Sequence, residues 1–346
     1  MRDQHVGAPI APPRPRSIAP PDVLVLGGGG ILGEAWLSAL LAGIERSGGF
    51  DPCACGGFVG TSAGSIVATA LLAGERPGAR LGRLPEQPPV AESDVGEEPS
   101  TIRRALGTAI SLGGAALAPL ASVALSSSAP GGAVLRRTAL ARVRTGDRSL
   151  AELGRMIERF GLHWDGRLRI AAVELESGRR VMFGAPGATQ LSVSQAVQAS
   201  CAIPGVFRPL RAGGRSFVDG GVWSPTNIDA AEVGRGDRVL CLNPTGSMRA
   251  AIREPAGALE AVSRSLAAVS RSLAAAEALA LKRRGASTRT VNPDQDSVTA
   301  MGPNLMDPRR RQEVIGAGLR QGRRLAAELR AAEGSRPGQG SRAEED

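Results

Sequence analysis

The chain has 346 residues, of which 42% are hydrophobic and 22% charged, and its net charge is +9. This length suits one large globular domain or two ordinary ones. The chain has no tyrosine and only two histidines, His5 and His163, which excludes tyrosine chemistry and a histidine-rich metal site.

The basic residues and the cysteines indicate the partners and the environment. Lys282 is the only lysine among 42 basic residues, and the net positive charge favours anionic partners such as acidic lipid headgroups or nucleic acid. With 3% aromatic residues the chain offers few stacking platforms, so we expect no nucleic-acid partner. The cysteines match neither a zinc site nor a dense disulfide framework. They are Cys53, Cys55, Cys201 and Cys241. We therefore expect a reducing, cytoplasmic location.

Both ends of the chain have the composition of disordered segments. Residues 1–21 contain six prolines and no helical periodicity, and residues 333–346 consist mainly of Gly, Ser and charged residues. No apolar stretch follows Arg2, so the pattern of a signal peptide is missing. We expect a disordered arm, an ordered domain over 22–332 and a disordered tail.

The first ordered part predicts alternating strands and helices. An apolar strand at 23–26 is followed by a glycine-rich turn and a helix over 33–46. A second strand at 57–59 leads through a tight turn at 60–64 into a helix that ends near residue 73. Two strand–turn–helix units in succession predict an α/β fold with a mainly parallel sheet.

Residues 75–148 predict an insertion with a flexible first part and an apolar second part. Residues 75–100 are rich in Pro, Gly and Glu, whereas residues 105–135 carry no charge and are flanked by Arg103-Arg104 and Arg136-Arg137. The uncharged run is long enough to span a bilayer, but its prolines and glycines favour small buried or lid-like helices. A third interpretation is a lid that touches a lipid surface, with the four arginines near the phosphates.

After the insertion the alternation resumes. Predicted strands lie at 168–175, 180–183, 215–218, 238–242 and 288–291, and predicted helices at 149–160, 192–200, 256–284 and 308–332. The helix over 256–284 contains the heptad VSRSLAA twice, at 262–268 and 269–275, which predicts a packing helix with one apolar stripe.

The strongest chemical signal is the pentapeptide Gly60-Thr61-Ser62-Ala63-Gly64 between a strand and a helix. A G-x-S-x-G turn of this kind is so tight that its flanking positions must be glycine, and it exposes the serine Oγ above a helix N-terminus. The helix dipole there favours developing negative charge. The sequence therefore predicts Ser62 as a nucleophile.

The glycine-rich turn at 27–33 has two interpretations. Gly28-x-Gly30-x-x-Gly33 matches the dinucleotide-binding fingerprint, with Glu45 or Asp51 as the ribose acid. The same N–H groups at a helix N-terminus can instead form an oxyanion hole. The serine turn about 30 residues further on favours the second interpretation, because an acyl hydrolase needs both parts.

A serine nucleophile needs a base, and the sequence offers few. His163 lies in a polar turn before a strand with no companion motif, which indicates a surface residue. Asp219, in Val218-Asp219-Gly220-Gly221, ends an apolar strand, although Asp-Gly is also a common hairpin turn. With His163 set aside, a Ser62–Asp219 dyad is the simplest hypothesis.

Taken together, these motifs resemble the patatin-like phospholipase family. The resemblance rests on the order of GGGG-x-x-G at 27–33, GTSAG at 60–64, ASCAIPGVF at 199–207 and VDGG at 218–221, with MGPNLMD at 301–307 as a further similarity. It implies a three-layer α/β/α domain with a mainly parallel central sheet over 22–332, a helical lid-like insertion within 75–148, and lipid acyl hydrolase activity without metal or organic cofactor.

Carried over to this chain, the resemblance implies Ser62 as nucleophile, Asp219 as base and the N–H groups of Gly28, Gly29 and Gly30 as oxyanion donors. Gly33, Gly60, Gly64 and Gly220 complete the motifs. The family has Arg or Lys at the position of Leu32, which puts oxyanion stabilisation in doubt. The competing hypotheses are a dinucleotide-binding oxidoreductase and a non-catalytic, membrane-associated protein. Acyl-ester lipids, with peripheral contact to an anionic membrane, are the expected partners.

Overall fold

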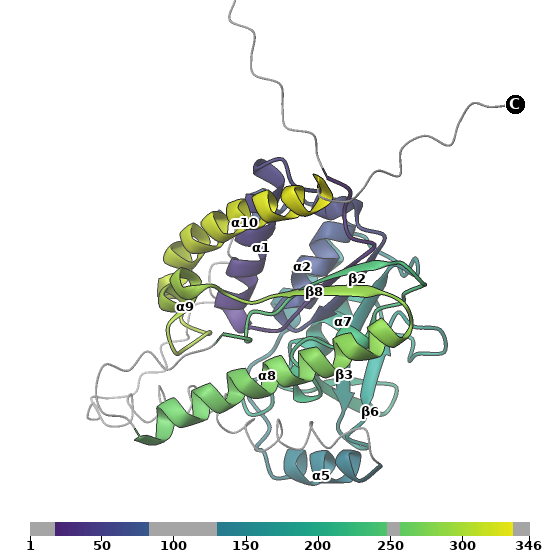
Figure 1. The fold of residues 1–346 in the computed structure, drawn as a ribbon. Helices are drawn as coiled ribbons and strands as arrows, with labels where there is room; N and C mark the ends of the chain where they lie inside the picture. The colour runs from purple at the N-terminus through teal and green to yellow at the C-terminus, as the bar shows by residue number, and fades with distance from the viewer. Residues whose placement is uncertain (1–17, 83–129, 248–256, 335–346) are drawn as a thin grey trace, which may run out of the picture.

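The fold is described from a computed structural model, which covers residues 18–82, 130–247 and 257–334 (Figure 1). The predicted arm up to residue 17, most of the uncharged run at 105–135 and the tail from residue 335 lie outside the described residues. No helix of the described part is long and apolar enough to cross a membrane.

A single mixed sheet of eight strands forms the centre of the protein. Hydrogen-bonded neighbours follow the order β5-β6-β3-β2-β1-β7-β8, and β4 also pairs with β3. The strands are β1 (Val23–Leu26), β2 (Gly57–Thr61), β3 (Leu168–Glu174), β4 (Arg180–Phe183), β5 (Leu210–Ala212), β6 (Arg215–Asp219), β7 (Arg238–Leu242) and β8 (Ser287–Val291). The five strands β3, β2, β1, β7 and β8 run parallel, so the carboxyl ends of β1 and β2 meet at one edge.

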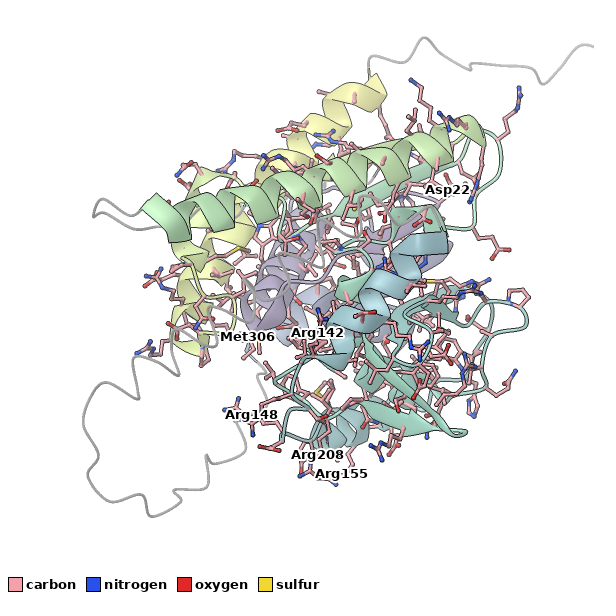
Figure 2. The ribbon with its side chains drawn as sticks, turned by 90° about the horizontal axis from the view of Figure 1, so that it is seen from below. Asp22, Arg142, Arg148, Arg155, Arg208 and Met306 are labelled. Carbon is pink, nitrogen blue, oxygen red and sulfur yellow. The ribbon has the colours of Figure 1, made fainter. Side chains whose placement is uncertain are left out.

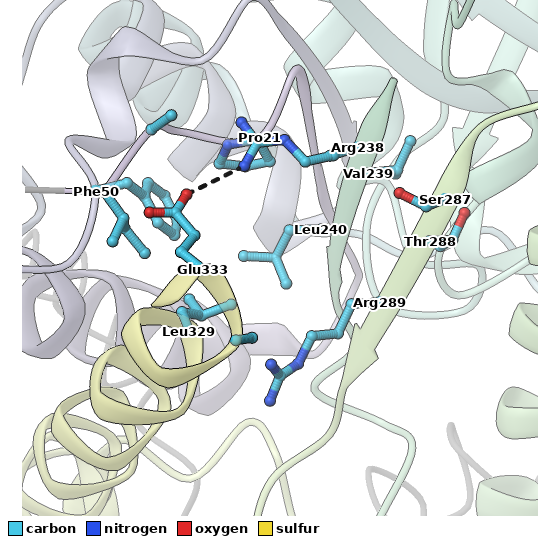
Figure 3. Close-up of a pocket in the computed structure, with 13 residues that line it drawn as sticks. Pro21, Phe50, Arg238, Val239, Leu240, Ser287, Thr288, Arg289, Leu329 and Glu333 are labelled. Carbon is cyan, nitrogen blue, oxygen red and sulfur yellow. Dashed lines mark ion pairs between the residues drawn. The ribbon is translucent and has the colours of Figure 1, made fainter. Parts of the chain in front are cut away.

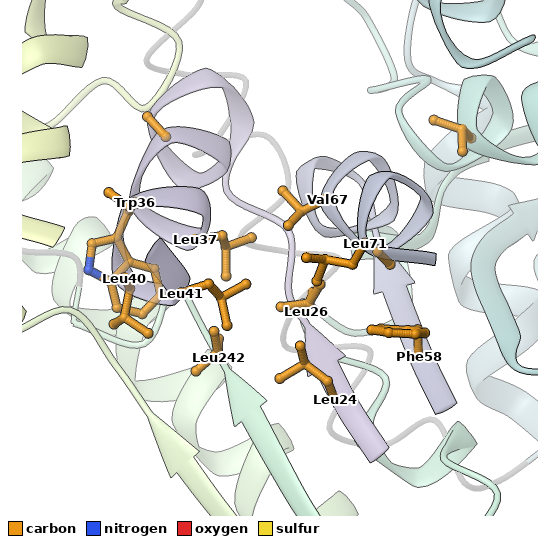
Figure 4. Close-up of a cluster of buried hydrophobic side chains, with 14 of the residues drawn as sticks. Leu24, Leu26, Trp36, Leu37, Leu40, Leu41, Phe58, Val67, Leu71 and Leu242 are labelled. Carbon is orange, nitrogen blue, oxygen red and sulfur yellow. The ribbon is translucent and has the colours of Figure 1, made fainter. Parts of the chain in front are cut away.

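Helices cover both faces of this sheet and give three layers. They are α1 (Gly30–Arg46), α2 (Ala63–Leu72), α5 (Pro130–Ala141), α6 (Ala151–Glu158), α7 (Val193–Ser200), α8 (Gly257–Arg283), α9 (Gln295–Met301) and α10 (Arg311–Gly334). On β1 the side chains alternate, as a strand requires. Leu24 and Leu26 pack against α1 and α2 (Figure 4), whereas Val23 and Val25 pack in the cluster that holds Leu281 of α8. The expected three-layer α/β/α architecture is therefore present.

Strand β3 pairs with three other strands, β2, β4 and β6, and brings the ends of β2 and β6 together. A strand has two edges, and β4 occupies one of them over Ile170–Val173. On the other edge β2 pairs up to Thr61, opposite Ala171, and β6 pairs from the opposite direction up to Asp219, opposite Ala172. Two strands thus meet end to end along β3, and their last residues lie next to each other.

The predicted elements recur with shifted ends. Helix α1 starts at Gly30, three residues before the predicted start, because the last glycine of the run already belongs to its first turn. Ser192 caps α7, and with Gln195 it forms a full capping box. The short strand β5 and helix α9 were not predicted, since neither has a clear periodic pattern. Asp219-Gly220 forms no hairpin: a 3-10 turn, Gly220–Val222, follows β6.

Candidate active site

Ser62 lies at the sharp turn between β2 and α2. Its backbone has φ 50° and ψ −122°, a strained conformation for a residue with a side chain. The glycines beside it are required by contact: a Cβ on Gly64 would collide with the carbonyl of Leu26, and one on Gly60 would lie 2.5 Å from Cα of Ser65. The turn therefore requires glycine at positions 60 and 64.

Hydrogen bonds to its backbone hold this turn in place. The N–H of Ser62 donates to Oγ of Ser200, the last residue of α7, at 2.8 Å. Its carbonyl accepts from the hydroxyl of Ser65 at 2.6 Å and from the N–H of the same residue at 2.8 Å. Ser62 itself is 7% exposed. Both backbone polar groups are thus satisfied, and the side chain is left for another partner.

Asp219 reaches Ser62 because β6 and β2 end at the same place on β3. The carboxyl is 5% exposed, and burial raises its pKa to about 6. Two hydrogen bonds lower this pKa again, one with the Ser62 side chain and one from the N–H of Gly221 at 2.7 Å. Gly220 is needed at this junction, since a Cβ there would lie 2.7 Å from the carbonyl carbon of Ala171. The arrangement places a carboxylate acceptor beside the serine hydroxyl.

The glycine-rich loop lies against the same serine. A Cβ on Gly28 would lie 3.3 Å from Cβ of Ser62. The N–H of Gly28, however, donates to the carbonyl of Pro225 at 2.8 Å. Within the described residues, the N–H groups of Gly29 and Gly30 donate to no backbone carbonyl. The predicted set of three donors is thus reduced to two in this conformation, Gly29 and Gly30.

The remaining residues of the loop set its shape. Gly30 has φ +60°, and a Cβ there would lie 2.6 Å from Sδ of Met306. The N–H of Gly33 donates to the carbonyl of Gly29 at 2.8 Å. Leu32 is fully buried in the core between the sheet and α1. Because its side chain packs in this apolar cluster, it takes no part in the hydrogen bonds of the loop backbone.

A buried carboxyl on α8 connects the loop and the nucleophile strand. One oxygen of Glu277 accepts from the hydroxyl of Thr226 and from the N–H of Ile228, both at 2.8 Å. Burial raises the pKa of Glu277 to about 7, and Asp229 adds to this rise. The segment that Glu277 holds contains Pro225, which accepts the N–H of Gly28.

The same segment also reaches β2. Asn227 has a left-handed φ of 53°, and its amide donates to the hydroxyl of Thr61, next to Ser62, at 3.0 Å. One short segment, 225–228, therefore contacts both the glycine-rich loop and the nucleophile strand. This anchoring was not predicted, because nothing in the local sequence around Glu277 marks it.

The alternative base and the alternative ribose acids lie at the other edge of the sheet. His163 is exposed and precedes β3, whereas Ser62 follows the parallel strand β2. Asp51 likewise precedes β2, and Glu45 lies at the far end of α1; both carboxylates pair with Arg76. Neither acid can reach a ligand at the glycine-rich loop, so the geometry contradicts the dinucleotide interpretation.

The lipid-surface interpretation of the uncharged run fails at Arg136. That interpretation placed Arg136 near lipid phosphates, but its side chain is fully buried. Its guanidinium lies 4.2 Å from the centre of the Trp223 ring and donates to the carbonyl of Gly178 at 2.7 Å. Burial lowers its pKa to about 10, to which the nearby Arg180 contributes. Arg137 is exposed, and Arg103 and Arg104 lie outside the described residues.

Three polar groups at the site were missed in the sequence. The hydroxyls of Ser65 and Ser200 hold the backbone of Ser62. The N–H of Ala63 begins α2 and, within the described segments, donates to no backbone carbonyl. The position after a G-x-S-x-G serine is a known oxyanion donor, so this signal was available. The thiol of Cys201 is buried 3.9 Å from Oγ of Ser65, and burial raises its pKa.

Comparisons with known proteins agree with the motifs. A sequence model of the patatin-like phospholipase family matches residues 165–232, which include Asp219 but not Ser62. No curated protein sequence matches the chain. Among solved structures, the crystal structure of VipD from Legionella pneumophila matches at 19% sequence identity with a TM-score of 0.41, over 91% of this chain and 67% of that one. The family model thus confirms the resemblance to the patatin-like phospholipases over residues 165–232.

Proposed function

Because the chain carries a segment similar to the patatin-like phospholipases, we propose that it is a serine acyl hydrolase that cleaves fatty-acyl esters of lipids. Ser62 is the nucleophile, Asp219 the base, and the glycine-rich loop the oxyanion site. The observation that carries this proposal is the end-to-end meeting of β2 and β6 on β3, which brings a strained serine and a buried carboxyl together.

In the first step Asp219 takes the hydroxyl proton while Oγ of Ser62 attacks the ester carbonyl carbon. The carbonyl oxygen becomes an oxyanion, which the N–H groups of Gly29 and Gly30 bind. The N-termini of α1 and α2 both start at this point, and their dipoles favour the same negative charge. Asp219 then returns the proton to the leaving alcohol, which departs and leaves an acyl-serine.

In the second step Asp219 removes a proton from water, which attacks the acyl carbonyl. The tetrahedral intermediate collapses, Ser62 leaves as an alkoxide and recovers its proton from Asp219, and the fatty acid is released. A carboxylate is a weak base near neutral pH. The raised pKa of Asp219, about 6, brings it closer to the operating range.

The proposal is tested by ester hydrolysis with the full chain. Wild type is expected to release fatty acid from a monoacyl ester such as p-nitrophenyl butyrate and from phosphatidylcholine, and Ser62→Ala to lose both activities. Ser287→Ala is the matched control, because that serine is exposed at the start of β8, at the opposite edge of the sheet, and its hydroxyl donates to the carbonyl of Asp237. Equal hydrolysis by wild type and Ser62→Ala would contradict the proposal.

A further inference from the structure

Two loops beside the site carry four arginines without ion-pair partners. The segment 142–148 runs alongside the segment 203–208: Arg148 forms a bridge with Phe207, and the N–H of Arg208 donates to the carbonyl of Arg148 at 2.9 Å. The side chains of Arg142, Arg144, Arg148 and Arg208 are exposed, and none forms an ion pair within the described residues. Asp147, the one acid between them, is also exposed and unpaired there.

Apolar side chains lie between these arginines. Val206 and Phe207 are half-buried, and no residue of the segment 203–208 is fully buried. We name the four arginines together with Val206 and Phe207 the arginine face. Figure 2 shows Arg148 and Arg208 together, on the side of the molecule away from Asp22, which marks the amino-terminal edge of the sheet.

The arginine face is directly connected to the nucleophile. The segment that carries Arg208 continues from Ala202, whose carbonyl accepts the N–H of Asp219 at 3.0 Å. Two residues earlier Ser200 accepts the N–H of Ser62. One loop of the arginine face is thus continuous in sequence with the residues that bind the backbone of Ser62 and Asp219.

The combination of charge and apolar area identifies the partner. Unpaired guanidinium groups bind phosphates, and half-buried apolar side chains gain from insertion at the boundary between headgroups and acyl chains. A nucleic acid would also attract arginines, but the arginine face has one aromatic residue, Phe207, and stacking needs more. We propose that the arginine face docks the protein on an anionic lipid bilayer, so that the site opens toward its substrate. The orientation rests on the proposed function, whereas the binding does not.

The test measures binding of the full chain to vesicles in the Ser62→Ala background, where no lipid is consumed. Vesicles of phosphatidylcholine alone are compared with vesicles that also contain phosphatidylglycerol. The variant R142Q/R144Q/R148Q/R208Q is expected to bind the anionic vesicles at least about tenfold more weakly, because each basic residue adds to the electrostatic attraction.

The matched control removes the same number of charges elsewhere. Lys282, Arg283, Arg320 and Arg323 are exposed on α8 and α10 and form no ion pair in the described ranges. The variant K282Q/R283Q/R320Q/R323Q is expected to bind within twofold of the parent. Equal loss in both variants, or no loss in either, would overturn the proposal, as would a duplex DNA that binds more tightly than the anionic vesicles through the same four arginines.

A separate measurement of ester hydrolysis distinguishes a failure of membrane docking from a failure of the proposed function. With Ser62 restored, the arginine-face variant is expected to hydrolyse the water-soluble p-nitrophenyl ester at the wild-type rate and to lose activity only on anionic vesicles. If wild type hydrolyses no ester at all, the proposed function fails while the vesicle-binding result stands. Circular dichroism and the thermal midpoint of each variant confirm that it is folded.

Discussion

The two edges of the parallel sheet have opposite chemical characters. At the carboxyl edge Ser62 is strained, Asp219 has a raised pKa, and the N–H groups of Gly29 and Gly30 have no backbone acceptor in the described part. At the amino edge the charges are paired: Arg76 contacts Glu45 and Asp51, and Arg238 contacts Asp22 and Glu333.

The amino edge nevertheless contains a well-formed cavity. Its volume is about 240 Å³, and Phe50, Leu240 and Leu329 line it, with the Arg238–Glu333 ion pair at its side (Figure 3). Its lining includes the hydroxyls of Ser287 and Thr288, while its carboxylate, Glu333, pairs with Arg238. The candidate active site lies instead where strand ends converge, in keeping with the rule that ligands bind at the carboxyl ends of parallel strands.

The largest difference between the edges is expected in kcat when each candidate base, Asp219 or His163, is replaced. Asp219→Asn should lower kcat for ester hydrolysis by on the order of 10³-fold, because it removes the general base. His163→Asn should leave kcat unchanged, because the imidazole is exposed and precedes β3. Steady-state hydrolysis of a soluble ester checks both. Loss of activity in His163→Asn with retention in Asp219→Asn would reverse the assignment of the base.

The oxyanion loop can be tested with a pair of glycines that have nearly the same φ. Gly30 has φ +60° and Gly161 has φ +61°, so alanine would be held in the left-handed region of φ at both positions. Only at Gly30 would the new Cβ meet neighbours, Met306 Sδ at 2.6 Å and the carbonyl oxygen of Leu305 at 3.0 Å. We expect Gly30→Ala to lower kcat by on the order of 10²-fold, the cost of one oxyanion donor.

Gly161→Ala should change only stability, by roughly 1–2 kcal/mol. Ester kinetics and thermal unfolding separate the two effects. If Gly30→Ala retains full kcat, the loop contributes no oxyanion donor at this position.

The pH dependence distinguishes the two buried carboxyls. A base must be ionised, and the pKa of Asp219 is about 6, so kcat/KM should fall about tenfold per unit as the pH drops below 6. Glu277, with a pKa of about 7, also loses its charge over this range. In Glu277→Gln, which keeps an acceptor for Thr226 and Ile228, the fall near pH 6 should persist. If kcat/KM of Glu277→Gln no longer falls near pH 6, the titrating group is Glu277 and not Asp219.

The smallest effect is expected at the amino edge. Leu329→Phe should partly fill the cavity without touching Ser62 or Asp219. Hydrolysis of long-chain and short-chain esters should each stay within about twofold of wild type, since changes of this kind act locally. A selective loss for long acyl chains would place the acyl-binding site at the amino edge and undo the comparison.

The strained serine turn at 60–64 was predictable because its signal is local. The glycine requirement at positions 60 and 64 comes from contacts with residues close in sequence or in the adjacent strand, such as Ser65 and Leu26. The alternation of strands and helices was equally clear for the same reason. The ends of elements moved, as with α1, where a glycine run obscures the first turn, and the short elements β5 and α9 were not predicted.

The rest depends on contacts between distant segments. That Asp219 meets Ser62 follows from the register of β3, where Ala171 and Ala172 pair with two different strands. The role of Glu277 depends on a segment about 50 residues away. The sequence left open whether Arg136, which flanks an uncharged run, lies at a lipid surface, and only tertiary packing against Trp223 shows that it is buried.

The most direct test of the account is covalent labelling with a fluorophosphonate, followed by mass spectrometry of the labelled peptide. An activated serine reacts with this reagent through its oxygen and displaces fluoride. The account predicts a single adduct on Ser62 in wild type, weaker labelling in Asp219→Asn, and no labelling in Ser62→Ala. Labelling that persists in Ser62→Ala, or its absence from folded wild type, would contradict the central claim.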